Sequence, residues 1–158
     1  MLDLAIITED LLVGTQVRSD EDVKLLKSLG VKGLLSVQDD TDLDSAGLRW
    51  DILWRIGMKA GIDMRRYPIR DFSPGDLMEK LPGALDELQE LLDEHDRVYV
   101  HCTAGINRSA GVILSHLVLR RNMSLEKAYR LLKSRRPQAS PYQSLLSFLG
   151  TPQDAGEE

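Results

Sequence analysis

Residues 98–110 read Val98-Tyr-Val-His-Cys-Thr-Ala-Gly-Ile-Asn-Arg-Ser-Ala110, and they carry the strongest structural signal in the chain. The apolar run from Arg97 to His101 predicts a buried strand, and the apolar run that begins at Ser109 predicts a helix. Between them lies a short segment in which Gly105 permits the backbone angles of a tight loop. Because open α/β sheets bind ligands at the carboxyl ends of their strands, we expect Cys102 at a binding edge.

The loop after Cys102 has the composition of an anion site. A loop wrapped between a strand and a helix turns successive N–H groups inward, and the helix N-terminus adds further donors. Arg108 can reach back over the loop and hold two phosphate oxygens with its planar guanidinium. The same donors favour the thiolate form of Cys102. We therefore expect a phosphate to be bound by Arg108 and by the loop residues Thr103, Ala104, Gly105, Ile106 and Asn107.

The rest of the chain alternates strands with helices. Hydrophobic patterning predicts strands at 4–7, 11–13, 31–37, 65–69 and 97–101. It predicts helices at 19–29, 48–56, 74–94, 109–121, 125–135 and 141–150, with Pro82 expected to break or kink the third of these. A polar loop is expected over 38–44. These elements predict an α/β fold with a single central, mostly parallel sheet flanked by helices.

Length and composition indicate one globular domain. The chain has 158 residues, 42% hydrophobic and 28% charged, which suits one globular domain over residues 1–150 and a polar, disordered tail over 151–158. A single cysteine excludes a disulfide framework and a cysteine-built zinc site within one chain. No apolar run is long enough to span a membrane and the start lacks a basic secretory signal, so we expect a cytoplasmic protein that binds no membrane.

Charge is unevenly distributed along the chain. Residues 97–140 hold nine Lys or Arg and one acid, within a chain of net charge −5. A basic half favours an anionic ligand, although solvated helix faces explain it equally well. Nucleic-acid binding has no recognised motif here and little aromatic stacking surface, so none is expected. The run Asp40, Asp42, Asp44 fails as a calcium loop because Ser45 stands where glycine is required.

The segment His101-Cys-Thr-Ala-Gly-Ile-Asn-Arg-Ser109 resembles the His-Cys-x5-Arg-Ser/Thr signature of the cysteine-dependent protein tyrosine phosphatase superfamily, and the short chain resembles its dual-specificity branch. Arg136-Pro-Gln-Ala-Ser-Pro-Tyr142 resembles that branch too. The resemblance implies that Cys102 attacks phosphorus and that Arg108 stabilises the charge. It implies that Ser109 helps the thiolate leave, that His101 supports the loop, and that no metal or cofactor is needed.

The resemblance also implies a general acid some thirty residues before the cysteine. Asp71 follows the predicted strand at 65–69 and is the expected proton donor to the leaving oxygen. Asp71 could instead only cap the next helix, although Ser73 is better placed for that, and Asp76 is the alternative acid. His95 and His116 have no such context and are expected to be surface and helix residues.

The resemblance implies that the substrate is a phosphate ester, and other features of the sequence indicate its class. The neutral loop side chains argue against an inositol polyphosphate. Three stretches resemble glucan phosphatases, the group of laforin and the plant starch phosphatases: Leu35–Asp40, the helix with Trp50 and Trp54, and Ile69–Phe72. Phe72 would then stack on sugar, whereas the two tryptophans could equally pack in the core. Ile106-Asn107 resembles phosphoprotein phosphatases instead. The sequence therefore favours phosphoglucan, with phosphoprotein hydrolysis and phosphate binding without turnover as alternatives.

Overall fold

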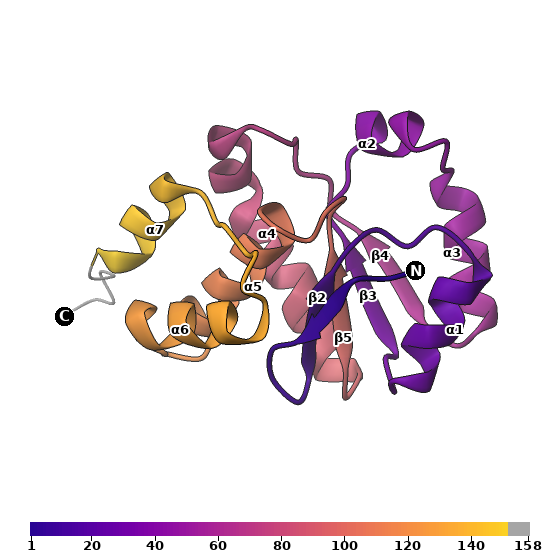
Figure 1. Cartoon of the computed structure of the whole chain (residues 1–158), viewed down its shortest axis with the longest axis horizontal. Helices are drawn as coiled ribbons and strands as arrows, with labels where there is room; N and C mark the ends of the chain where they lie inside the picture. Colours follow the sequence, from indigo (N-terminus) through magenta and orange to yellow (C-terminus); the bar gives the residue numbers. More distant parts are fainter. Residues whose placement is uncertain (152–158) are drawn as a thin grey trace.

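The computed structural model describes residues 1–151, and its centre is one five-stranded sheet (Figure 1). The strands are β1 (Leu4–Ile6), β2 (Leu11–Gly14), β3 (Gly33–Ser36), β4 (Asp63–Arg66) and β5 (Val98–His101). The helices are α1 (Asp20–Ser28), α2 (Asp40–Ser45), α3 (Trp50–Lys59), α4 (Pro74–Glu94), α5 (Arg108–Leu119), α6 (Leu125–Arg135) and α7 (Gln143–Gly150). The strand order is β1-β2-β5-β3-β4, and only the β1–β2 pair is antiparallel. The predicted α/β fold is confirmed.

Strand β5 lies in the middle of the sheet and carries the signature segment. It pairs in parallel with β2 on one side and with β3 on the other. In both pairs His101 is the last residue in register, opposite Gly14 in β2 and Ser36 in β3. The carboxyl ends of three strands therefore meet directly below Cys102, at the edge where the sequence predicts a binding site.

Helices cover both faces of the sheet, because alternate residues of each strand face opposite sides. Val98 and Val100 belong to a core to which helices α4, α5, α6 and α7 all contribute buried side chains. Tyr99 belongs to the second core, which α1 and α3 cover on the other face (Figure 1). Leu43 of α2 also belongs to this second core, so the second face is covered by short helices.

Two predicted elements differ from the structure at the carboxyl edge. Residues 40–45 form the short helix α2 where a loop was expected, because Asp39 and Asp42 each accept a hydrogen bond from the other's backbone N–H. This reciprocal cap satisfies donors at the helix start. Strand β4 covers 63–66 rather than 65–69. Tyr67 still donates to the Ser36 carbonyl at the end of β3 and Ile69 to the Val37 carbonyl just after it, but Pro68 between them has no N–H and ends regular pairing.

Pro82 was expected to break or kink helix α4, and the prediction of a break was wrong. The helix runs from Pro74 to Glu94 without interruption. Leu77, Leu81 and Leu85 are all buried, whereas Pro82 is exposed, so the hydrophobic contacts on either side of it hold the helix together. Of the predicted tail, Thr151 donates its N–H to the Phe148 carbonyl at the end of α7, and 152–158 lie outside the described residues.

Candidate active site

In the loop from Cys102 to Asn107, five consecutive carbonyl groups accept hydrogen bonds from residues that are not part of the loop. The Cys102 carbonyl accepts from His101 Nδ1 at 2.9 Å and the Thr103 carbonyl from the Gln16 N–H at 3.0 Å. Arg136 donates from Nη2 to the Ala104 carbonyl at 3.1 Å and from Nε to the Gly105 carbonyl at 2.6 Å. The Ile106 carbonyl accepts from the Ser140 N–H at 2.7 Å. These contacts come from three parts of the chain, namely Gln16, His101 and the segment 136–140, and fix the orientation of five consecutive peptide groups.

The orientation of those carbonyls determines where the loop N–H groups point. All peptide bonds among residues 1–151 are trans, so each N–H points opposite to the carbonyl of the preceding residue. The N–H groups of residues 103–107 therefore face the inside of the loop. None of these five N–H groups donates to another group within the described chain. An array of this kind, placed before a helix N-terminus, suits a tetrahedral anion.

Gly105 is required at the crown of this loop for two reasons. Its φ of +67° lies in the left-handed region, where residues with a Cβ are strained. A Cβ at this position would also lie 2.4 Å from the carbonyl carbon of Gly14 at the end of β2. The loop therefore closes directly against the neighbouring strand.

Cys102 is buried at the base of the loop, with 3% of its surface exposed. Its Sγ lies 3.2 Å from the Ser109 Oγ, so the hydroxyl can donate to a thiolate. Burial lowers the pKa of His101 to about 4, and the charge of Arg108 acts in the same direction. His101 is consequently neutral near pH 7, and its Nδ1–H donates to the Cys102 carbonyl. The described contact of His101 is therefore with the backbone of the loop.

Arg108 is buried, and the Nη1 atom of its guanidinium is held by two hydrogen-bond acceptors of the protein. Nη1 donates to the Asp42 carboxylate at 2.6 Å and to the Ile69 carbonyl at 2.9 Å. Nη2 lies 3.3 Å from the Asp71 carboxylate and 3.5 Å from the Thr103 hydroxyl. Nε donates to no group among residues 1–151, so the Nε–Nη2 edge is the one that can turn to a phosphate.

Electrostatic coupling links Arg108 to the carboxylate that holds it. Burial disfavours the charge of Arg108, but the hydrogen bond to Asp42 and the charges of Cys102 and Asp42 raise its pKa above the usual range. Burial also opposes ionisation of Asp42, yet its hydrogen bonds with Arg108 and the Asp39 backbone hold its pKa below the usual value. Both groups therefore remain charged across the physiological pH range.

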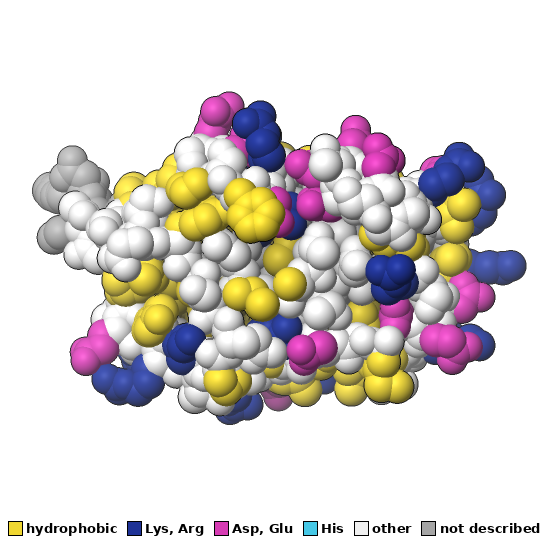
Figure 2. All heavy atoms as spheres, turned by 45° about the horizontal axis from the view of Figure 1, so that its top comes forward, with side chains coloured by type: hydrophobic (Ala, Val, Ile, Leu, Met, Phe, Trp, Pro, Cys, Tyr) yellow, Lys and Arg dark blue, Asp and Glu magenta, His cyan; other side chains and the backbone are white. Residues whose placement is uncertain are grey.

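Asp71 and Phe72 lie on the loop between β4 and α4, at the rim of the site. Asp71 is partly exposed and accepts a hydrogen bond from the Phe72 N–H at 2.9 Å. Phe72 has a φ of +56° and is 89% exposed, so its ring faces solvent beside the acid. The face that contains the carboxyl edge shows hydrophobic and acidic side chains next to one another (Figure 2).

Asp76, the alternative acid, lies in a different environment. Its carboxylate accepts from the Arg70 N–H at 2.7 Å, and Lys80 lies beside it. The Arg70 hydrogen bond and Lys80 lower the pKa of Asp76, although burial acts the other way. A carboxyl held in its ionised form is poorly suited to donate a proton. Ser73 caps α4 by accepting from the Asp76 N–H, as predicted, which leaves Asp71 free of that task.

Sequence reasoning missed two residues of the site. Asp42 belongs to the aspartate run considered as a calcium loop, and the structure places it against Arg108. Arg136 was quoted only within a family resemblance, and the structure shows it buried and bound to two loop carbonyls. A short Asp-x-x-Asp cap signals the helix that carries Asp42, but no local pattern signals either long-range contact.

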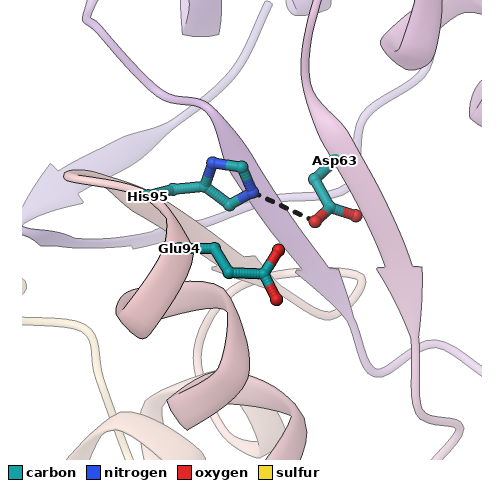
Figure 3. A group of neighbouring side chains, drawn as sticks. All are labelled: Asp63, Glu94 and His95. Carbon is teal, nitrogen blue, oxygen red and sulfur yellow. Dashed lines mark hydrogen bonds and ion pairs between the residues drawn. The ribbon is translucent and has the colours of Figure 1, made fainter.

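The other two histidines lie away from the loop. His116 is on helix α5 and buried, and burial lowers its pKa to about 4. His95 follows helix α4 and its Nε2 lies 3.0 Å from the Asp63 carboxylate. Figure 3 shows the His95 and Asp63 side chains together with Glu94. Neither histidine contacts Cys102.

The group of Asp63, Glu94 and His95 has the composition of a metal site, yet a protein cation already pairs with both of its carboxylates. Arg65 Nη2 lies 3.1 Å from the Asp63 carboxylate and 3.5 Å from that of Glu94. Its Nη1 lies 2.6 Å from the Glu90 carboxylate. Asp63 begins β4, at the edge of the sheet opposite to Cys102. The positive charge that a metal would supply there is supplied by Arg65.

Comparison with known proteins agrees with this geometry. The family model for the dual specificity phosphatase catalytic domain matches residues 14–153. The chain is 35% identical over 133 residues to a phosphoglucan phosphatase of Castanea sativa, DSP4, covering 82% of this chain and 35% of that protein. It is 33% identical over 123 residues to the Arabidopsis thaliana phosphoglucan phosphatase LSF1, covering 78% of this chain and 21% of that protein. The chain thus spans about a fifth to a third of the length of these relatives.

Protein phosphatases and solved structures also match. Human dual specificity protein phosphatase 4 is 29% identical over 126 residues, covering 80% of this chain and 28% of that protein. The crystal structure of human DUSP28 superposes with a TM-score of 0.71 at 25% identity, covering 92% of this chain and 89% of that one. No helix within residues 1–151 is both long and apolar enough to cross a membrane. The matched family model, the loop of inward N–H groups and the buried Cys102 lead to one conclusion: the chain belongs to the dual specificity phosphatases, a family of cysteine-dependent phosphatases.

Proposed function

We propose that this chain hydrolyses phosphate monoesters through a phosphocysteine on Cys102. The observation that carries the proposal is the set of five inward N–H groups of residues 103–107. They surround the position above Cys102 Sγ where a phosphoryl group would bind. Together with Arg108 they stabilise the charge on the three equatorial oxygens, which is the main requirement of phosphoryl transfer.

The first step forms a sulfur–phosphorus bond and breaks the ester bond. Cys102 Sγ attacks phosphorus, and the leaving oxygen takes a proton from the Asp71 carboxyl. Asp71 is placed for this role because its carboxylate, 3.3 Å from Arg108 Nη2, lies at the rim of the same site. The negative charge of the bound phosphate favours the protonated form of a neighbouring carboxyl group.

The second step returns the enzyme to its starting state. Water attacks phosphorus, gives a proton to the Asp71 carboxylate, and breaks the sulfur–phosphorus bond to release inorganic phosphate. The Ser109 hydroxyl, 3.2 Å from Sγ, donates to the departing thiolate. His101 keeps the loop in place through its bond to the Cys102 carbonyl and takes no proton in either step.

We propose phosphoglucan as the substrate class. Phe72 supports this because an exposed ring directly after the acid offers a flat apolar face to a sugar. The neutral loop side chains Thr103, Ala104, Ile106 and Asn107 add no positive charge for a second phosphate. The two plant relatives at 33% and 35% identity are named phosphoglucan phosphatases. The two tryptophans lie in different environments, because Trp50 packs on the second core whereas Trp54 is 44% exposed.

Phosphoprotein hydrolysis is the second candidate. Ile106 is partly exposed on the loop and followed by Asn107, a pair that resembles phosphoprotein phosphatases, and human dual specificity protein phosphatase 4 is nearly as similar, at 29% identity. A cytoplasmic location and a catalytic domain over residues 1–150 stay predictions.

The experiment compares phosphate release from solubilised phosphoglucan and from a phosphotyrosine peptide, with EDTA present and the Cys102→Ser variant as blank. The proposal predicts turnover of phosphoglucan that the variant abolishes. Release from the peptide alone would assign the chain to phosphoprotein hydrolysis. Wild-type protein that matches the blank on both substrates, yet binds inorganic phosphate, would instead support a phosphate-binding module without turnover.

A further inference from the structure

A groove of about 780 Å³ lies between helices α1 and α3, on the less covered face of the sheet. Its apolar lining includes Val23 from α1 and Ile52, Ile56 and Met58 from α3. Ile52 and Met58 are each 45% exposed, which is unusual for large apolar side chains that have a core beside them. None of the lining residues belongs to the candidate active site.

The rim of the groove is strongly basic. Lys24 and Lys27 from α1 and Arg55 and Lys59 from α3 line it, with Asp20 as the only acid in the lining. Lys27, Arg55 and Lys59 form no ion pair with any group of residues 1–151, and Lys24 has only a 3.9 Å contact with exposed Glu21. Figure 2 shows basic side chains next to hydrophobic ones at the end of the molecule that holds α1 and α3. The four cations and one acid of the lining make the groove basic although the whole chain carries a net charge of −5.

The shape and chemistry of the groove select among possible occupants. An extended strand would need an unpaired sheet edge, whereas the groove offers only side chains of two helices. A sugar would need aromatic faces and polar donors, but the floor is aliphatic. Helix α3 has ten residues, which gives the groove a length of roughly 15 Å, or close to three turns of a facing helix. An amphipathic helix can place an apolar stripe on such a floor.

We propose that the groove is a docking site for an acidic amphipathic helix of a partner protein. Apolar side chains at positions i, i+3, i+4 and i+7 of that helix contact Ile52, Ile56 and Met58. Its flanking Asp and Glu side chains pair with Lys27 and Arg55 at the rim. Charge complementarity determines the choice of partner, because four cations and one acid face the occupant.

The test uses a synthetic helical peptide of about 14 residues with Leu on one stripe and Glu between, and a matched peptide with Lys in place of Glu. Amide chemical shifts of the labelled protein are followed during titration. The proposal predicts saturable shifts confined to α1 and α3 with the Glu peptide alone. It predicts that the double variant Lys27→Glu, Arg55→Glu weakens binding at least about tenfold, whereas Lys127→Glu on α6 does not.

A matched pair of variants tests the apolar contacts of the proposed docking site. Ile52→Ser should weaken binding, whereas Trp54→Ser, at nearly equal exposure on the same helix but outside the groove, should not. Hydrolysis of p-nitrophenyl phosphate by each variant verifies the fold independently. Equal binding of the Lys peptide, shifts outside α1 and α3, or no saturation at millimolar peptide would overturn the proposal. Binding of anionic lipid vesicles in place of the Glu peptide would overturn it too.

Discussion

Replacement of Arg136 by methionine tests how the loop is held. Arg136 is 2% exposed and donates to the carbonyls of Gly105 at 2.6 Å and Ala104 at 3.1 Å, and its Nη1 donates to the Asp3 carboxylate at 3.2 Å. Methionine refills the volume of the aliphatic stem but donates no hydrogen bond. The two carbonyls would then lose their partners, and the peptide groups of the loop would be free to rotate.

The magnitude follows from the two lost loop bonds and the lost ion pair with Asp3. A hydrogen bond from a charged donor contributes about 1.5–3 kcal/mol, so the two loop bonds contribute about 3–6 kcal/mol at most. The ion pair adds only about 0–1 kcal/mol, because the Asp3 carboxylate is largely exposed. With the apolar packing of methionine set against this, we expect the free energy of unfolding to fall by about 3 kcal/mol. Misdirected loop N–H groups should lower kcat/KM by about 100-fold, since small misplacements of binding groups have effects of that size.

The neighbouring arginine provides a matched control. Arg135 is exposed and donates only to the Ile6 carbonyl at 3.4 Å, so Arg135→Met should change stability by no more than about 0.5 kcal/mol. Urea unfolding measures the stability of both variants, and p-nitrophenyl phosphate hydrolysis measures their activity. If Arg136→Met is as stable and as active as Arg135→Met, the loop orientation does not depend on this residue and the reasoning is refuted.

Three further predictions concern the site and its pH dependence. Asp42→Asn should lower kcat about tenfold because it frees one corner of Arg108, as steady-state kinetics would show. His101 and His116 have a pKa of about 4 in the fold, below the 6.5 of a free histidine, so the unfolded chain binds protons there that the folded chain does not. Stability should therefore fall as the pH drops from 6.5 towards 4, by about 2 kcal/mol per histidine at pH 5, measurable by urea unfolding. Phe72→Ala should lower kcat/KM for phosphoglucan about tenfold and leave p-nitrophenyl phosphate turnover within about twofold.

Each of these three has a result that would count against it. Unchanged or higher kcat in Asp42→Asn would mean that the carboxylate only competes with the substrate for Arg108. Equal unfolding free energies at pH 7 and pH 5, or a His116→Gln variant with the wild-type pH dependence, would contradict the effect of buried histidine. Parallel losses on both substrates in Phe72→Ala would mean that the ring shapes the acid loop and does not bind sugar.

Local sequence patterns predicted the centre of the fold well. The run from Val98 to Ser109 combines strand, loop and helix start within a few residues, so its structure depends mainly on neighbours in sequence. Helix caps at Ser73 and Ser124 were predicted for the same reason and each accepts the N–H three residues on. Patterns of this kind are local and can be read from one sequence.

The errors arose where distant contacts outweigh local preference. Pro82 disfavours a helix, but buried leucines on both sides of it pack on the sheet and keep α4 continuous. The polar run around Asp42 lacks the apolar period of a helix, yet reciprocal capping and the contact with Arg108 order it. Local patterns contain no information about a partner 66 residues away.

The site was predicted to the extent that its residues are adjacent in the chain. Cys102, Arg108 and Ser109 lie in one segment, and Asp71 was placed by a family spacing. Arg136 holds the loop from outside, although it lies 31 residues after Gly105 in the chain. The residues next to Arg136 in sequence give no sign of this contact. The outer contacts of a binding loop are therefore the part that only the structure reveals.

The central claim is that Cys102 carries the phosphoryl group during turnover. The direct measurement is acid quenching during hydrolysis of p-nitrophenyl phosphate, followed by mass spectrometry of the peptide that contains Cys102. The account predicts a phosphoryl group on Cys102, increased in Asp71→Asn if water attack depends on that carboxylate, and absent in Cys102→Ser. Turnover that persists in Cys102→Ser, or a phosphoryl group on another residue, would contradict it.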